Sequence, residues 1–426
     1  MEILLLFGSF ILLLLLRVPI ALTLAISSLL TGLYMDIDLA AIVQRMVGGV
    51  NSLSLIAIPF FILAGEIMNE GGISRRLINL ANVLIGRIRG GLALVNVITS
   101  TFFGGISGSA LADVSSLGSV LIPMMKKSGY DADYAVSVTV SSAAQGVIIP
   151  PSHNMIIYST AAGGVSVGAL FMGGIIPGLL LGLAILTLTY IIAAKKNYPK
   201  GEPVKKEEIP KIIREGLLGL FTAVIIMGGI ISGIFTATES AAIGALYAFI
   251  ISFFVYRDVP LKRFSTILYR TFRTLSMVMF LIAASSGFGW LLALLKVPAM
   301  ATNAILSISP NDIITLLLIN IILLLLGMVM DMAPLILITT PILLPIVVSI
   351  GMDPVHFGVM LVLNLAIGLI TPPVGSVLFV GAAIGRLSIE KVAKAMLPFY
   401  AVMIIVLLLV TFVPSLVMYL PSILSK

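Results

Sequence analysis

Apolar segments follow one another along almost the whole of this 426-residue chain. Many of them are about 20 residues long, which is enough for an α-helix to cross a bilayer with a hydrocarbon core of about 30 Å. A helix satisfies its own backbone hydrogen bonds inside that core, where no water is present to do so. The sequence therefore predicts an all-α polytopic membrane protein, with the lipid bilayer as its surroundings.

The composition excludes several other classes of protein. Hydrophobic residues make up 60% of the chain and charged residues 10%, and the mean hydropathy is +1.21. A soluble domain has about 45–50% apolar and about 25% charged residues, so a soluble enzyme, a disordered protein and a nucleic-acid binder are excluded. The net charge of +7 comes from lysines and arginines that cluster between the apolar runs, which is typical of multi-pass membrane proteins.

Positive charges decide the topology of two interrupted apolar segments, 91–125 and 312–349. Two arginines precede the first segment and two lysines follow it, so both of its ends are expected on the cytoplasmic side. The second segment suits entry from the opposite side, and both are predicted to be re-entrant hairpins. Two amphipathic stretches, 73–89 and 258–273, are expected to lie along the cytoplasmic interface. Crossing helices are then predicted at 3–16, 18–34, 52–70, 131–163, 165–194, 216–234, 238–256, 274–294, 355–385 and 396–420.

The two halves of the chain repeat one pattern. Residues 146–163 (GVIIPPSHNMIIYSTAAG) align with 368–385 (GLITPPVGSVLFVGAAIG), and 109–123 (SALADVSSLGSVLIP) align with 327–341 (GMVMDMAPLILITTP). Each half has five predicted crossings and one hairpin, and because five is odd the second half is inverted relative to the first. Inverted repeats with discontinuous helices are the architecture of secondary transporters. The predicted parts are a first inverted repeat at 1–194 with broken helix 131–163, a cytoplasmic linker at 195–215, and a second inverted repeat at 216–426 with broken helix 355–385.

The tip of the first hairpin, GGISGSALAD at 104–113, has the composition of a sodium site. Its glycines let the chain turn, and unwound backbone inside a membrane needs a polar partner for its free carbonyl and amide groups. Ser107 and Ser109 add hydroxyl oxygens to such a cage. The alternative is a helix-packing face made of small residues.

Asp113 and Asp331 are the two ionisable residues in the most apolar surroundings. A carboxylate within a membrane segment is costly, and it marks a functional site by default. An acid at the start of a hairpin helix can instead simply cap that helix. Asp331 is predicted to contribute charge to a second cation site, because its neighbours offer no other side-chain oxygen, and Asp113 is predicted to be a further buried acid.

Double prolines interrupt two helices, at QGVIIPPS (145–152) and IGLITPPV (367–374). Proline lacks the amide that closes a helical hydrogen bond, so each break frees backbone carbonyls. One cation is predicted between each hairpin tip and the facing break, although a diproline can also be only a structural kink. The predicted sodium ligands are Gly105, Ser107, Ser109, Gly146, Gly327, Asp331, Gly368 and Thr371.

The helices that restart after the two breaks are expected to present their N-termini to an anionic substrate. Free amides and the positive end of the helix dipole favour such a ligand. His153 follows the first break and can contact substrate, although a lone histidine is more often hydrogen-bonded locally. The predicted substrate-binding residues are Pro151, Ser152, His153, Asn154, Pro373, Gly375 and Ser376.

No motif of an enzyme occurs in the sequence. A zinc HExxH motif, a nucleophile elbow, a phosphate loop and a dinucleotide fingerprint are all absent. Asp113 and Asp331 come from different halves, and neither is paired with a histidine base in the sequence. No catalytic residue and no nucleotide cofactor are therefore expected, and sodium is the only ion that the residues point to.

Three motifs carry a family resemblance: GGISGSALADVSSLGSVLIPMM, the paired IIPPS and ITPPV breaks, and FTATESAAIGALYA. Together they resemble the large membrane subunit of TRAP (tripartite ATP-independent periplasmic) transporters over essentially the whole chain. The resemblance implies a sodium-coupled importer of organic acids in the bacterial inner membrane, nearest to the sialic-acid branch. It also implies an elevator of the kind found in the ion transporter superfamily. The functional positions of the family match this chain at Ser107, Ser109, Asp331, Thr371 and the glycine-rich breaks.

The same resemblance implies two partners. Members of the family work with a small four-helix membrane subunit and with a periplasmic substrate-binding protein. The small subunit is fused at the N-terminus in some members, whereas this chain starts at its first helix, so a separate small subunit is expected. The main rival hypothesis is a self-sufficient sodium/dicarboxylate symporter with the same repeats. A membrane-embedded enzyme and a pure scaffold are the alternatives from other classes.

Overall fold

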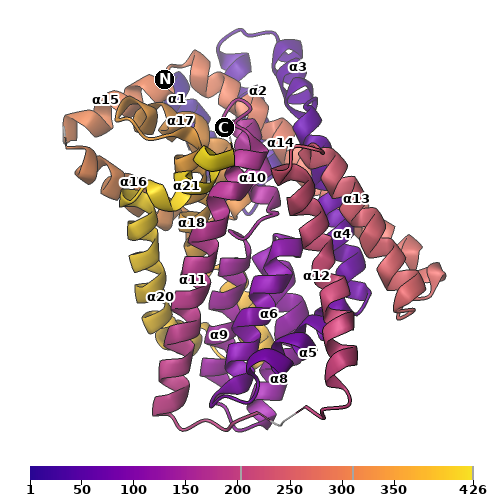
Figure 1. The fold of residues 1–426 in the computed structure, drawn as a ribbon. Helices are drawn as coiled ribbons and strands as arrows, with labels where there is room; N and C mark the ends of the chain where they lie inside the picture. Colours follow the sequence, from indigo (N-terminus) through magenta and orange to yellow (C-terminus); the bar gives the residue numbers. More distant parts are fainter. Residues whose placement is uncertain (202–203, 309–310, 425–426) are drawn as a thin grey trace.

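The computed structural model of the protein describes residues 1–201, 204–308 and 311–424. Every regular element in these residues is a helix, so the predicted all-α class is confirmed. Figure 1 shows both termini at the upper end of the molecule and the connection from α11 to α12 at the lower end. Residues 202–203 of the predicted linker, and residues 309–310 and 425–426 of the predicted second repeat, lie outside this description.

The helices alternate between long spans and short pieces. The first part of the chain forms α1 (Glu2–Leu15), α2 (Ile20–Tyr34), α3 (Leu39–Val50), η1 (Leu53–Ile56), α4 (Ala57–Glu70), α5 (Ile73–Ile85), α6 (Gly91–Ser107), α7 (Ala110–Asp113), η2 (Val114–Gly118), α8 (Ser119–Lys127), α9 (Ala132–Gly146), α10 (His153–Ala161) and α11 (Val167–Lys195). The second part forms α12 (Ile209–Ile231), α13 (Ala237–Ile250), η3 (Ile251–Val255), η4 (Leu261–Arg263), α14 (Phe264–Leu294), α15 (Val297–Ile308), α16 (Asp312–Gly327), α17 (Met332–Ser349), α18 (Pro354–Gly368), α19 (Ser376–Gly385), α20 (Ile389–Phe412) and α21 (Ser415–Leu424).

Six helical stretches in the described residues are long and apolar enough to span a bilayer. They are Val167–Lys195, Ile209–Ile231, Ala237–Val255, Leu261–Leu294, Met332–Ser349 and Ile389–Phe412. Fewer continuous spans are present than the ten crossings expected from the sequence, because several predicted crossings are made of shorter pieces. α1 and α2, for example, have 14 and 15 residues, which at a rise of 1.5 Å per residue gives only about 21–23 Å.

The segment from α6 to α8 starts and ends at the same end of the molecule. α6 packs against α7, η2 and α8. Just before α6, the amide of Gly90 donates a hydrogen bond to the carbonyl of Pro199 at 3.0 Å. Just after α8, the hydroxyl of Tyr130 donates to that same carbonyl at 3.3 Å. The chain therefore folds back on itself between these two points, with its turn inside the protein.

The segment of α16 and α17 also folds back on itself. Asp312 at the start of α16 and Asp353, which follows α17, line one hollow of about 260 Å³ together with His356 of α18. Figure 1 shows α16 and α17 in the upper half of the molecule and α6 and α8 in the lower half. The two hairpins therefore enter the protein from opposite ends.

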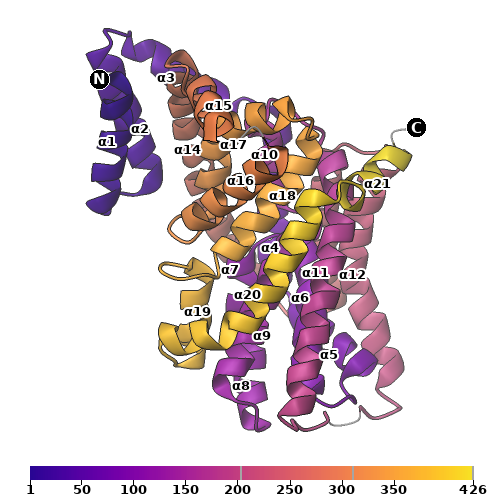
Figure 2. The same cartoon turned by 90° about the vertical axis from the view of Figure 1, so that its left-hand side faces the viewer.

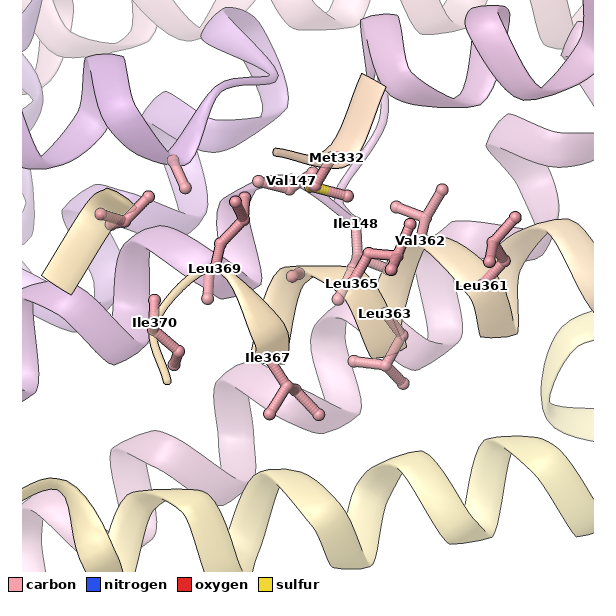
Figure 3. Close-up of a cluster of buried hydrophobic side chains, with 14 of the residues drawn as sticks. Val147, Ile148, Met332, Leu361, Val362, Leu363, Leu365, Ile367, Leu369 and Ile370 are labelled. Carbon is pink, nitrogen blue, oxygen red and sulfur yellow. The ribbon is translucent and has the colours of Figure 1, made fainter. Parts of the chain in front are cut away.

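Two helices are interrupted at the diprolines. Residues 147–152 separate α9 from α10, and residues 369–375 separate α18 from α19. The peptide bonds Pro150–Pro151 and Pro372–Pro373 are both cis. Figure 3 shows Val147 and Ile148 of the first break in one buried apolar cluster with Met332 of α17 and with side chains of α18. The two halves of the chain thus share a core where their breaks meet.

Three helical features differ from the sequence prediction. α3 and α15 were not predicted, since both lie between the long apolar runs. The stretch 258–273 was expected to lie along the interface by itself, but most of it is continuous with α14. The helix continues because no glycine or proline occurs in residues 264–286. Figure 2 shows α1 and α2 as a pair at one side of the molecule, next to α14, against which α2 packs.

The predicted linker is partly fixed to the helical body. α12 already begins at Ile209, inside the segment that was expected to be a linker, and proline in its first turn suits a helix start. Just after α11, the ammonium of Lys196 donates to the carboxylate of Asp131 at 2.6 Å. The amide of Gly201 donates to the carbonyl of Gly86 at 3.1 Å. This segment therefore connects the end of α5 with the start of α9.

Candidate ion and substrate site

The first hairpin turns at Gly108, whose φ of 60° lies in the left-handed region that glycine adopts most easily. Ser107 ends α6, and Ser109 caps α7 by accepting a hydrogen bond from the amide of Ala112 at 3.3 Å. The amide of Ser109 donates to the hydroxyl of Ser107 at 3.4 Å. The two predicted serines therefore flank the turn, and Ser109 also has a capping role.

The tip of the first hairpin lies against the first diproline break. A Cβ atom placed on Gly105 would lie 3.2 Å from the carbonyl oxygen of Pro150. A Cβ atom placed on Gly108 would lie 3.2 Å from the carbonyl oxygen of Pro151 and 3.2 Å from Nδ1 of His153. Carbonyls of the break therefore face the tip, and only a backbone without side chains can approach them this closely.

The backbones of α6 and α9 meet close to the tip. A Cβ atom placed on Gly104 would lie only 2.1 Å from the Cα of Gly146. A Cβ atom placed on Gly146 would lie 3.4 Å from Oδ2 of Asp113 and 3.4 Å from the carbonyl oxygen of Ser100. Gly146 therefore forms one wall of a small polar niche that contains the Asp113 carboxylate.

The carboxylate of Asp113 is fully buried. Its Oδ1 accepts a weak hydrogen bond from the hydroxyl of Ser100 at 3.3 Å, and its Oδ2 has no hydrogen-bond partner in the part of the chain that the structure describes. A buried polar atom without a partner costs about 1–3 kcal/mol, and more when it is charged. The π-helix η2 follows directly, and such elements occur often at functional sites. A bound cation or a proton would therefore stabilise the buried Asp113 carboxylate.

Polar side chains of α6 continue this niche towards α9. The amide nitrogen of Asn96 donates to the hydroxyl of Thr139 at 2.6 Å, and that of Gln145 donates to the hydroxyl of Thr101 at 2.8 Å. The oxygen atoms of both amides are buried and unpartnered within the described residues. The sequence analysis did not single out Asn96 or Gln145, although a polar residue within an apolar run is a recognisable signal.

A cavity of about 130 Å³ separates the first tip from α4 and α14. A Cβ atom placed on Gly65 of α4 would lie 3.7 Å from the Cα of Ser107, so α4 contacts the tip. The sequence analysis missed the two polar α4 residues of this cavity, Glu66 and Asn69, because FILAGEIMNE was taken only as part of a crossing. The polar side chains that line the cavity are Glu66, Asn69, Ser107, Ser109, His153 and Thr274.

The predicted substrate residues of the first break lie at or beside this cavity. His153 begins α10 and lines the cavity. Ser152 is fully buried with an unpartnered hydroxyl, judged over the described residues. Asn154 and Pro151 are buried next to them. The first break therefore offers polar groups that are not yet satisfied.

The predicted substrate residues of the second break are not brought to this cavity. Pro373 is exposed, and Gly375, with a φ of 47°, precedes Ser376 at the start of α19. The amides of Val374 and Gly375 donate to the carbonyl of Met328 at 3.0 and 3.3 Å. The amides of Val374 and Gly375, just before this helix start, are therefore not free in this structure, because the tip of the second hairpin already uses them.

The second hairpin and the second break touch through glycines, as the first pair does. A Cβ atom placed on Gly368 would lie 2.6 Å from the Cα of Gly327, and one placed on Gly327 would lie 3.1 Å from the Cα of Gly368. Gly327 ends α16 and Gly368 ends the first half of the broken helix. The two predicted glycine ligands of the second half are therefore in direct backbone contact.

Two predicted oxygen ligands of the second half already have protein partners. The hydroxyl of Thr371 donates to the carbonyl of Ile367 at 2.7 Å, which leaves its lone pairs available to a cation. Asp331 caps α17, and its Oδ1 accepts from the amide of Met332 at 2.9 Å. Asp331 is also exposed, so the expectation of a deeply buried carboxylate at this position is wrong. The hairpin turn itself exposes it, whereas Asp113 lies behind its own tip.

Two hairpins that meet two proline-broken helices, in an apolar and wholly helical fold, define a multi-pass membrane transporter. The sequence model of the family described as "Tripartite ATP-independent periplasmic transporter, DctM component" matches residues 7–416. The chain therefore belongs to this family, the large permeases of TRAP transporters. Since the family consists of transporters, the expectation that the protein is not an enzyme is confirmed.

Individual relatives agree with this assignment. The protein is 43% identical to YgiK of Salmonella typhimurium, an uncharacterized protein, over 99% of this chain and 97% of that one. It is 40% identical to the sialic acid TRAP transporter large permease protein SiaM of Vibrio cholerae, over 89% of this chain and 88% of that one. It is also 40% identical to the C4-dicarboxylate TRAP transporter large permease protein DctM of Vibrio cholerae, over 96% of this chain and 94% of that one. The YdaH transporter of Alcanivorax borkumensis shares the fold, with a TM-score of 0.63, 12% identity and 88% of each chain covered.

Proposed function

We propose that this chain is the transport subunit of a sodium-coupled TRAP importer that moves an organic acid across the bacterial inner membrane into the cytoplasm. Two relatives of equal identity carry the names of sialic acid and of C4-dicarboxylates, so the shared chemistry is that of a carboxylate anion. The observation that carries sodium coupling is the fully buried Asp113 carboxylate, which has an unpartnered oxygen beside the first break.

The first cation site is proposed in the niche between the first tip and α9. Asp113 supplies charge, and the carbonyl of Ser100 lies against the same wall at Gly146. Gly105, Ser107 and Ser109 bring further backbone and hydroxyl oxygens from the tip. Sodium is a hard cation that is coordinated by backbone carbonyls at unwound helices in transporters, and all of these donors are oxygens.

The second cation site is proposed at the second tip and break. Gly327 and Gly368 bring the two backbones together, and Thr371 has hydroxyl lone pairs left for a ligand. Asp331 contributes a carboxylate at the turn of this hairpin. The site differs from the first because its carboxylate is exposed and also caps a helix.

The transport movement is proposed to be that of an elevator built from two inverted repeats. Opposite entry of the two hairpins and the recurrence of a glycine contact at each tip support the repeats. A hydrogen bond from the ammonium of Lys126 in α8 to the carbonyl of Gly385 in α19, at 3.1 Å, joins the first hairpin to the second broken helix. Such a connection favours joint movement of these elements against α4, α5 and α14.

The partners are proposed to be a small four-helix membrane subunit and a periplasmic substrate-binding protein. Both follow from membership of a tripartite family rather than from any contact within this chain. Delivery by a binding protein also explains how relatives of similar sequence can serve different acids, because selection takes place on another chain.

Reconstitution tests this function. The chain, the small subunit and the binding protein are placed in liposomes, and uptake of N-acetylneuraminate and succinate is measured with each component and the sodium gradient omitted in turn. Uptake is expected only when all components and inward sodium are present. Uptake by this chain alone would identify a self-sufficient sodium/dicarboxylate symporter instead, and uptake independent of sodium would refute the coupling.

A further inference from the structure

The cavity at the first tip contains an acid that the proposed function does not use. Glu66 of α4 lines this cavity of about 130 Å³ together with Ser107, Ser109 and His153. The side chain of Glu66 is half-buried, and its carboxylate makes no hydrogen bond or direct ion pair within the described residues. A carboxylate of α4 therefore faces the part of the protein that is proposed to hold sodium and substrate.

The next acid along α4 is neutralised, in contrast to Glu66. Glu70 accepts hydrogen bonds from Arg270 and, at 3.4 Å, from Arg263. Arg270 also acts on Glu66, but only at longer range. Of these two α4 acids, the one that lines the cavity at the tip therefore has no direct partner, while the one a turn away is held by two guanidinium groups.

Within the described lining, the cavity has no lysine and no arginine. An organic anion at the tip would thus meet the charge of Glu66 without a fixed positive charge between them. Two negative charges that face the same small cavity repel each other strongly where water is partly excluded. Among the lining side chains that the structure describes, His153 is the only one that can become cationic, and bound sodium is the other source of positive charge.

We infer that Glu66 enforces the coupling of anion to sodium. Its fixed charge opposes the approach to α4 of a tip that carries the anion alone, and it attracts a tip whose bound sodium ions balance or exceed the anion. The inference rests on the proposed function, and it adds a role for α4. The charge on this helix interacts with the net charge of the bound anion and sodium ions, and it prevents passage of the anion without sodium.

The test compares Glu66→Gln with wild type in the full assembly in liposomes. The probe is whichever of N-acetylneuraminate or succinate the wild type takes up, measured with and without sodium. We expect the ratio of uptake with sodium to uptake without sodium to fall at least tenfold in Glu66→Gln, mainly because sodium-independent uptake rises. Glu66→Asp keeps the charge and is expected to keep most of the ratio. Glu70→Gln on the same helix frees Arg270, which acts on Glu66 at longer range, so it is expected to lower the ratio in the same direction but by less than Glu66→Gln does.

A second variant keeps the test decisive if Glu66→Gln fails to assemble. Asn69→Asp adds a negative charge to the same wall of the cavity. It is expected to lower the sodium concentration needed for half-maximal uptake at least threefold, because a further negative charge favours the tip with bound sodium over the tip with anion alone.

Two results separate the inference from the proposed function. If the wild type depends on sodium, and Glu66→Gln keeps the wild-type ratio or Asn69→Asp keeps the wild-type sodium requirement, the role of Glu66 is overturned and the transport function stands. If the wild type itself takes up the probes without sodium, the proposed coupling fails and the inference falls with it.

Discussion

The backbones of Gly104 in α6 and Gly146 in α9 are in direct contact, so that a Cβ atom on Gly104 would lie 2.1 Å from the Cα of Gly146. The second half repeats this contact between Gly327 and Gly368. In both halves, the end of the first hairpin helix meets the end of the helix before the diproline break. These contacts place each hairpin tip against the carbonyls that the prolines leave free.

Replacing Gly146 by alanine is expected to force these backbones apart. A methyl group there would lie 2.9 Å from the Cα of Gly104, and overpacking of this kind costs about 1–3 kcal/mol. The melting temperature of the purified protein should fall, and sodium-dependent uptake should fall at least tenfold. Gly228→Ala in α12 is the matched control, because a Cβ atom on Gly228 meets nothing within 4 Å. Equal behaviour of the two variants would contradict the importance of the contact.

Asp113→Asn is expected to separate ion binding from folding. The neutral amide removes a buried charge, so the stability of the protein in potassium chloride should stay the same or rise. Sodium should raise the melting temperature of the wild type, because a ligand that binds only the folded state stabilises it. The variant should lose this sodium-specific increase together with its uptake. A variant that sodium still stabilises as much as the wild type would remove Asp113 from the cation site.

Asp331 and Asp353 provide a matched pair that distinguishes a cap from an ion ligand. Both are exposed, and both cap a helix: Asp353 accepts from the amide of Val355 at 2.7 Å. Loss of such a cap costs about 0.5–2 kcal/mol, so Asp331→Ala and Asp353→Ala should lower the melting temperature similarly. Only Asp331→Ala should abolish sodium-dependent uptake while the protein remains folded. Near-normal uptake by that variant would leave Asp331 with its capping role alone.

A cross-link between Ser74 and Ser116 tests whether the first hairpin moves against α5. The hydroxyl of Ser116 in η2 donates to the hydroxyl of Ser74 at 3.3 Å, and the chain contains no cysteine, so introduced thiols are unique. The double variant Ser74→Cys/Ser116→Cys should lose uptake when oxidised and regain it when reduced, with bond formation followed by mass spectrometry.

The control for this cross-link joins two elements that are proposed to move together. Asn96→Cys/Thr139→Cys links α6 to α9, whose side chains are 2.6 Å apart at these positions. Oxidation of the control pair should leave the uptake of that variant unchanged. Full activity of the oxidised Ser74/Ser116 pair would argue against the elevator.

The contact between Asp131 and Lys196 gives a pH-dependent contribution to stability. Hydrogen bonds from Lys196 and Tyr198 hold the pKa of Asp131 below its ordinary value, and the bond to Asp131 raises the pKa of Lys196. A lowered carboxyl pKa stabilises the fold above the unfolded value of about 3.9, and a raised amine pKa does so below about 10.4. The contribution is therefore present between these limits, and on the acid side it is lost as the pH falls through the lowered pKa of Asp131.

Asp131→Asn should accordingly melt slightly below the wild type at pH 7. The effect is expected to be small, because the side chains of Asp131 and Lys196 are about half exposed and solvent screens the pair. The difference in melting temperature should shrink as the pH is lowered below about 4, which differential scanning fluorimetry can follow. A difference that grows with acid would contradict this account of the contact.

The sequence could predict the elements that glycine and proline determine locally. The diproline breaks and the turn at Gly108 depend on residues whose backbone preferences are strong in any context. The first hairpin could be inferred as well, because lysines and arginines flank it on both sides and such residues cluster at the cytoplasmic ends of membrane segments.

The remaining features depend on contacts between distant parts of the chain. The exposure of Asp331 and the bonds from Val374 and Gly375 to Met328 follow from how the second tip meets its break, and no local pattern encodes them. Glu66 was missed because its role depends on the face that α4 turns towards Ser107. In each case the sequence indicates the residue type, and only the fold indicates which group lies opposite.

The two glycine crossings also limit how these helices can rearrange. Contacts between side chains can adjust stepwise when the side chains change rotamers. Gly104 and Gly146 have no side chains, so their contact cannot adjust in this way. The crossing must either stay closed or separate as a whole, and the same holds for Gly327 and Gly368. Hinges for any large displacement are therefore expected in the loops that connect such rigid pairs, and compounds that wedge a crossing open should act as all-or-none inhibitors.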